Sequence, residues 1–215
     1  MRRHSIILTL LLTFSASSLL ASGGMAIPKR DKASDAIAAY NDGIAARDRA
    51  WQFEKELEAA QDAAQKTKLA EKIAKAYKSA VRAQRDAVRN DPKLFQAHAE
   101  LGYALRKTGD YTAALQSYDK ALALQPNYAE AIEYRGEAYL GLNRVSDARD
   151  AYLVLFNGGD ATRSQMLATA MANWIEKRRV DSAGVDTATI EELAKFLEQR
   201  TEISRNAVAT SGSWK

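Results

Sequence analysis

The side chains that most often carry catalysis or bind metal ions are scarce in this sequence of 215 residues. It contains no cysteine and two histidines, His4 and His98, and His4 lies in an N-terminal leader described below. His/Cys metal sites and histidine triads need several partners of these types, so His98 is expected to pack in the core. A hydrolase that uses two carboxylates needs neither type and stays open as the last-ranked hypothesis. We therefore expect no enzyme, no cofactor and no metal ion.

Charged residues form the more informative pattern. Glu130, Glu133 and Glu137 are spaced by three and four residues, which places them on one face of a helix. We interpret them as an acidic ridge that faces the basic pair Arg106 and Lys107. Two interpretations stay open: the ridge binds a ligand, or these charges only solvate one another. With a formal charge of +4 and no basic stripe interleaved with aromatics, the sequence does not indicate nucleic-acid binding.

The elements that position these residues follow from an internal repeat. Pro92 and Pro126 are 34 positions apart, and each closes a helical pattern. Small and aromatic residues recur at the same offset: Gly102 with Gly136, Ala104 with Ala138, Ala114 with Ala148 and Tyr118 with Tyr152. Counting backwards, Ala114, Ala121 and Tyr111 correspond to Ala80, Ala87 and Tyr77. The sequence therefore predicts three consecutive copies of one helical unit, the first of which matches only in its second half.

Each full copy is predicted to be a pair of helices joined by a short turn, and it resembles a known family. The pattern of Leu101-Gly102, Gly109-Asp110-Tyr111, Ala114, Tyr118, Ala121 and Pro126 resembles the tetratricopeptide repeat. Residues 129–155 resemble a second copy that departs from the pattern, because Arg135 replaces the usual Leu and Asn143 the turn Gly. Hairpins of this kind must stack on neighbours to bury their apolar faces.

The resemblance implies a concave groove lined by the first helix of each repeat, which binds a protein or peptide. Carrying the family's groove positions onto this sequence selects partner-binding candidates in both copies: Gln96, Tyr103, Arg106 and Lys107, then Glu130, Glu133, Tyr134 and Glu137. Ala99 and Leu140 stand at the remaining groove positions. These positions are expected to face solvent inside the groove.

The N-terminus has the layout of a secretory signal peptide. Arg2 and Arg3 precede an apolar run from Ile6 to Ala21, and small residues follow. We predict a signal peptide over residues 1–26 with cleavage after Gly23 or Ala26, and a periplasmic or secreted protein. An uncleaved membrane anchor is the weaker alternative, because the run is shorter than the ~20 residues that a spanning helix needs.

The predicted fold is all-α: a short tetratricopeptide-like solenoid of helical hairpins with a long N-terminal hairpin and a C-terminal helical cap. Residues 27–94 form the long hairpin, with its turn near residues 61–68; residues 95–128 and 129–159 form the two repeats, the second edge-like. Residues 160–205 form the cap, in which Asp160 starts one helix and Thr189 the last, and residues 206–215 a flexible tail.

Two functions are compatible with this architecture. The first is a noncatalytic adaptor or assembly factor of the bacterial cell envelope that holds a protein or peptide in the groove. The second is a structural protein that dimerises through its long N-terminal helices, so that both a monomer and a homodimer stay open. An association with the membrane is expected only if the signal peptide is left uncleaved.

Overall fold

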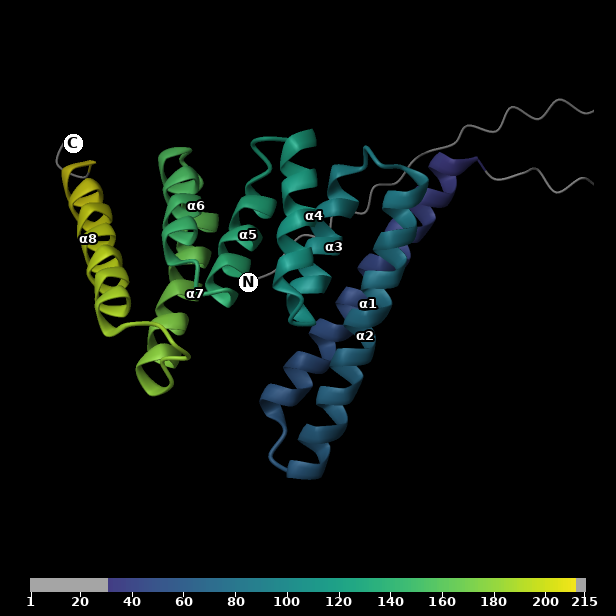
Figure 1. Cartoon of the computed structure of the whole chain (residues 1–215), viewed down its shortest axis with the longest axis horizontal. Coiled ribbons are helices and arrows are strands. Elements are labelled where there is room, and N and C mark those ends of the chain that lie inside the picture. Colours follow the sequence, from purple (N-terminus) through teal and green to yellow (C-terminus); the bar gives the residue numbers. More distant parts are fainter. Residues whose placement is uncertain (1–30, 212–215) are drawn as a thin grey trace, which may run out of the picture.

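The structure is a computed structural model that describes residues 31–211 (Figure 1). Over this range the chain forms eight α-helices and no strand, which confirms the predicted all-α helical solenoid. The helices, in order, are α1 (Lys32–Ala59), α2 (Ala63–Asn90), α3 (Phe95–Lys107), α4 (Tyr111–Leu124), α5 (Ala129–Gly141), α6 (Val145–Asn157), α7 (Ala161–Val180) and α8 (Thr187–Ser211). The predicted signal peptide lies outside the described residues.

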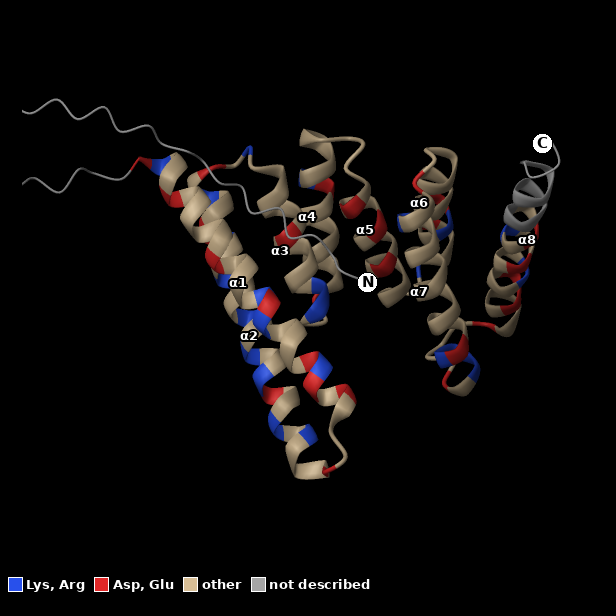
Figure 2. Ribbon diagram, turned by 180° about the vertical axis from the view of Figure 1, so that it is seen from behind, with Lys and Arg blue, Asp and Glu red and all other residues tan. Residues whose placement is uncertain are grey.

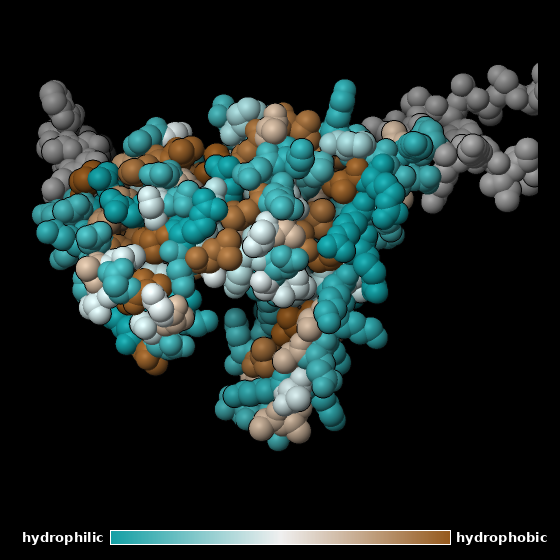
Figure 3. Space-filling model, viewed as in Figure 1, coloured by the Kyte–Doolittle hydropathy of each residue, from teal (hydrophilic) through white to brown (hydrophobic). Residues whose placement is uncertain are grey.

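Consecutive helices pair into hairpins, and the hairpins stack along the length of the molecule (Figure 1). Each odd-numbered helix packs against its even-numbered successor, and α3 contacts both α1 and α5, while α5 also contacts α7. The first helices of all four hairpins are therefore neighbours in space. We call the surface they share, formed by α1, α3, α5 and α7, the first-helix surface. Figure 3 shows the molecule hollowed between the far end of the long α1–α2 hairpin and the end of α7.

The 34-residue repeat has a direct structural meaning in the second helices. Ala80, Ala114 and Ala148 occupy equivalent places in α2, α4 and α6, and each is at most 1% exposed. The next equivalent set, Gln84, Tyr118 and Tyr152, is also buried. Because each copy uses the same positions to close its hairpin, the packing residues recur with the period of the fold. The residues that recur every 34 positions in the sequence are therefore residues of the core.

Glycines in the first helices let each hairpin close tightly. A Cβ atom at Gly102 would lie 2.5 Å from Cε1 of Tyr118, and one at Gly43 would lie 2.3 Å from Nε2 of Gln84. Gln84 stands 34 residues before Tyr118, so the long hairpin has the same close contact as the repeat that follows it.

The turn of the long hairpin differs from the sequence prediction. Residues 60–62 connect α1 to α2, whereas the prediction placed the turn near residues 61–68. The side chain of Asp62 accepts a hydrogen bond from the backbone N–H of Gln65 at 2.7 Å, and this cap starts α2 early. Most of the expected turn is therefore the first part of α2.

The C-terminal hairpin also differs in its last helix. Asp160 caps α7 as predicted, accepting from the N–H of Arg163 at 2.9 Å. The last helix begins at Thr187 rather than Thr189, because Asp186 is its cap and accepts from the backbone N–H of Thr189 at 2.8 Å. It continues to Ser211, which corrects the tail predicted from residue 206.

Candidate partner-binding surface

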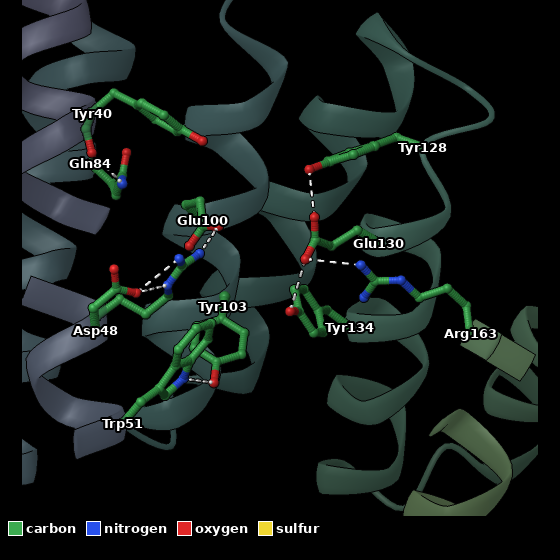
Figure 4. Close-up of polar contacts among 11 residues, drawn as sticks. Tyr40, Asp48, Trp51, Gln84, Glu100, Tyr103, Tyr128, Glu130, Tyr134 and Arg163 are labelled. Carbon is green, nitrogen blue, oxygen red and sulfur yellow. Dashed lines mark hydrogen bonds and ion pairs between the residues drawn. The ribbon is translucent and has the colours of Figure 1, made fainter. Parts of the chain in front are cut away.

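A row of aromatic side chains joins the first helices. Trp51 of α1 donates a hydrogen bond from Nε1 to the hydroxyl of Tyr103 of α3 at 2.6 Å (Figure 4). The ring of Tyr103 lies 4.8 Å from that of Tyr134 of α5, centroid to centroid. Tyr103 and Tyr134 are 4% and 2% exposed. Both were expected to face solvent in the groove, and their burial shows that they pack the helices together instead.

Glu130 stands at the centre of a hydrogen-bonded cluster between α5 and α7. It accepts bonds from the hydroxyls of Tyr128 at 2.8 Å and Tyr134 at 3.0 Å, and Arg163 approaches it at 3.1 Å (Figure 4). Burial opposes ionisation, but Arg163 and the two hydroxyls outweigh it and hold the pKa of Glu130 below its ordinary value. Glu130 is therefore an ionised carboxylate in a fixed orientation, and its side chain is 26% exposed.

Glu133 has a very different environment one turn along α5. Its side chain is fully buried, and Oε2 pairs with Nη1 of Arg163 at 2.5 Å. Oε1 meets no hydrogen-bond donor in the part of the chain that the structure describes. Burial and the nearby charge of Glu137 raise the pKa of Glu133 to about 7, although its ion pair with Arg163 opposes the change. Glu133 thus does not belong to a solvent-facing ridge, which corrects the sequence interpretation.

The basic pair of α3 divides between two neighbouring helices. Arg106 pairs with Glu137 of α5 at 2.5 Å, as the acidic ridge predicted, while Lys107 pairs with Glu54 of α1 at 2.6 Å. The guanidinium of Arg106 also lies 5.2 Å from the ring centroid of Tyr103. The two cations of α3 therefore pair with carboxylates on α1 and on α5, and these ion pairs connect three hairpins.

Sequence reasoning missed a buried ion pair between α1 and α3. Arg47 binds both Asp48 and Glu100, and the Arg47 and Glu100 side chains are 8% and 10% exposed (Figure 4). Burial raises the pKa of Glu100 to about 7, although Arg47 opposes the change. A signal was present in the sequence: Arg47 follows Gly43 by four residues, as Arg106 follows Gly102. Arg163 was missed as well, because α7 carries no clear repeat signature.

The other candidate positions vary in exposure. Gln96 is half-buried on α3, while Ala99 and Leu140 are buried and unavailable to a partner, contrary to expectation. His98 is only half-buried, and its Nε2 lies 2.9 Å from the carbonyl oxygen of Pro92. Side chains that reach the first-helix surface while held by contacts to a neighbouring helix or residue are Arg106, Lys107, Tyr128, Glu130, Glu137 and Arg163.

This arrangement offers hydrogen bonds and paired charges on a surface shared by four helices. Within residues 31–211 no group of three or more His, Cys, Asp or Glu side chains is placed to hold a metal ion. Over the same range no helix is both long enough and apolar enough to cross a membrane.

Stacked antiparallel hairpins with a shared first-helix surface define a helical-repeat scaffold. Residues 102–143, from α3 to the turn after α5, match the family model of the TPR repeat, the tetratricopeptide repeat of the sequence analysis. This match supports a protein of the tetratricopeptide-repeat type and, in general terms, a protein–protein interaction module. The comparison with curated proteins gave no match.

The raised pKa values of Glu100 and Glu133 predict a pH-dependent stability. Both are about 7 in the folded state against an ordinary 4.5, so the folded state binds protons more tightly than the unfolded state. The resulting stability is complete below 4.5 and is lost as pH rises through about 7. Thermal melts followed by circular dichroism should therefore show a falling midpoint over this window. Glu133→Gln should make the melting midpoint depend less steeply on pH. If its dependence on pH equals that of the wild type, the raised pKa assigned to Glu133 is wrong.

Proposed function

We propose that this protein is a noncatalytic adaptor or assembly factor that holds a protein or peptide against the first-helix surface. The observation that carries the proposal is the continuity of that surface. Each pair of neighbouring first helices is joined by an ion pair or hydrogen bond whose polar atoms reach solvent, as Arg106 with Glu137 and Arg163 with Glu130 show. A partner that crosses several repeats would meet an ordered row of donors and acceptors.

Order of this kind favours binding. The Glu130 carboxylate is fixed by two tyrosine hydroxyls and Arg163, so little side-chain freedom is lost when a partner contacts it. The surface charges are already matched within the protein, which favours a partner that bonds to oriented polar groups over one attracted by net charge alone. The TPR-repeat match supports a protein or peptide as the partner.

We place this activity in the bacterial cell envelope, in the periplasm or outside the cell. The support is the signal-peptide pattern of residues 1–26, with its basic start and apolar run. Among described residues, the long helices α1 and α2 bury their apolar faces against each other within one chain. We therefore propose a monomer and rank dimerisation through these helices second, with an envelope hydrolase last.

The test is a crosslinking pull-down from the exported fraction with a variant of the first-helix surface. The variant combines Gln96→Ala, Glu54→Gln and Lys107→Ala, three side chains that are at least partly exposed and could contact a partner. In the wild type the hydroxyl of Tyr77 donates to Glu54 at 3.0 Å, and the new glutamine keeps an oxygen that can accept this bond. Exposed ion pairs contribute at most about 1 kcal/mol, so the fold should survive. The expected result is loss of the crosslinked partner.

A matched control changes one glutamine, one lysine and one carboxylate on the second helices, with Asp in place of Glu. Gln116→Ala, Lys120→Ala and Asp150→Asn lie at exposed positions of α4 and α6 and should leave partner capture unchanged. Equal capture by both triple variants would refute the assignment of the surface. Light scattering on the same samples should give one chain per particle, and a dimer would favour the self-association alternative.

A further inference from the structure

The solvent face of α2 carries a row of cations that the proposed function does not use. The side chains recur at spacings of three and four residues, are all exposed, and are Lys68, Lys72, Lys75, Lys78, Arg82, Arg85 and Arg89. At 1.5 Å per residue, the row is roughly 30 Å long. It lies opposite the buried face of α2, which includes Tyr77, Ala80 and Gln84. We call it the α2 basic row, and Figure 2 shows Lys and Arg along this helix.

Few acids balance this row. Its seven cations share their face with two acids, Glu71 and Asp86, and within residues 31–211 the one ion pair formed by the row joins Arg89 to Asp86 at 3.0 Å. Lys72 lies over the ring of Phe53, 5.2 Å from its centroid. On the first-helix surface, by contrast, Arg106, Lys107 and Arg163 all have carboxylate partners. The α2 basic row is thus a concentration of uncompensated positive charge that packing does not require.

We propose that the α2 basic row docks the protein onto the surface of a bilayer that contains anionic phospholipids. Four of the seven cations are lysines, whose compact charges on flexible stems suit a diffuse layer of headgroups more than a single bidentate site. No exposed large apolar side chain lies on α2, so the contact is electrostatic and without insertion. The face also presents no aromatic ring, which a site for stacked nucleic-acid bases would need.

Docking through this face is compatible with partner binding but independent of it. The row is on the side of α2 that faces away from the core, and α2 is not part of the first-helix surface. A bilayer contact there leaves α3, α5 and α7 open to a partner. Failure of one proposal therefore leaves the other intact, and the triple variant of the first-helix surface should bind vesicles as the wild type does.

Vesicle co-sedimentation of the full chain tests the proposal. Vesicles of equal parts phosphatidylglycerol and phosphatidylcholine are compared with vesicles of phosphatidylcholine alone, and the ratio of the two affinities is measured. Any contribution of the N-terminal apolar run is common to all variants and cancels when their ratios are compared. Lys68→Gln, Lys75→Gln and Lys78→Gln together should lower the ratio by about a hundredfold. Added salt should lower it for the wild type.

The control removes three exposed lysines from other helices. Lys55→Gln, Lys120→Gln and Lys195→Gln change the net charge by the same amount and should leave the ratio within about threefold of the wild type. An equal loss in both variants would show an effect of net charge and overturn the proposal. Equal binding of the wild type to both vesicle types would overturn it too, as would tighter binding to an oligonucleotide or an acidic peptide than to anionic vesicles.

Discussion

Replacement of Arg163 by methionine should destabilise the protein by about 3–5 kcal/mol at a pH above the raised pKa of Glu133, where this carboxyl is ionised. The guanidinium of Arg163 is the cation that contacts Glu133, whose side chain is fully buried between α5 and α7. Methionine keeps part of the apolar stem but leaves the buried carboxyl without a positive partner. Chemical denaturation followed by circular dichroism measures the loss. The loss should shrink at lower pH, because protonation of Glu133 removes the unpaired charge.

Two further variants separate charge pairing from general damage. Arg144→Met removes an arginine whose partner, Asp147, is 40% exposed, and it should cost much less than Arg163→Met because solvent screens this pair. Adding Glu133→Gln to Arg163→Met should recover part of the stability, because the fully buried carboxyl is then gone and only Glu130, which reaches solvent, has lost its cation. If Arg163→Met costs no more than Arg144→Met, the buried pair does not stabilise the contact between α5 and α7.

Gly102→Val should destabilise the fold by about 3 kcal/mol, the upper end of the usual overpacking cost. A Cβ atom at this position would lie 2.5 Å from Cε1 of Tyr118, and the fully buried ring of Tyr118 has no free space to move into. Helix propensity alone favours valine over glycine, so a net loss identifies the close approach of α3 and α4 as the cause. The shift in the urea midpoint measures it.

Ala123→Val is the control, because it adds the two γ-methyl groups of valine at an exposed position of α4 and should cost less than about 1 kcal/mol. The smaller change Gly102→Ala, combined with Tyr118→Leu, removes the ring atoms that the new Cβ would meet. That pair should be less destabilising than the sum of its two single changes. Simple additivity would mean that the two residues do not compete for space.

Much of the architecture was readable from the sequence because the packing residues repeat. Ala80, Ala114 and Ala148 recur every 34 residues, and all three close a hairpin in the structure. The α2 basic row was readable too, since its spacing of three and four is visible in the letters, but it was not recognised in the sequence analysis. The starts of the helices were predicted less accurately, because Asp62 and Asp186 cap α2 and α8 earlier in the sequence than the pattern indicated.

The sequence by itself determined the class of fold, because burial in a repeat depends on local helix geometry that each copy reproduces. Only the tertiary structure decided how the charged residues behave. Glu130 and Glu133 are three residues apart on one helix, yet Glu130 reaches solvent and Glu133 is buried. The difference arises from Arg163, which α7 brings to them from about 30 residues away, and from the tyrosines that close around Glu130. Such pairings depend on distances between helices, which a periodic pattern does not specify.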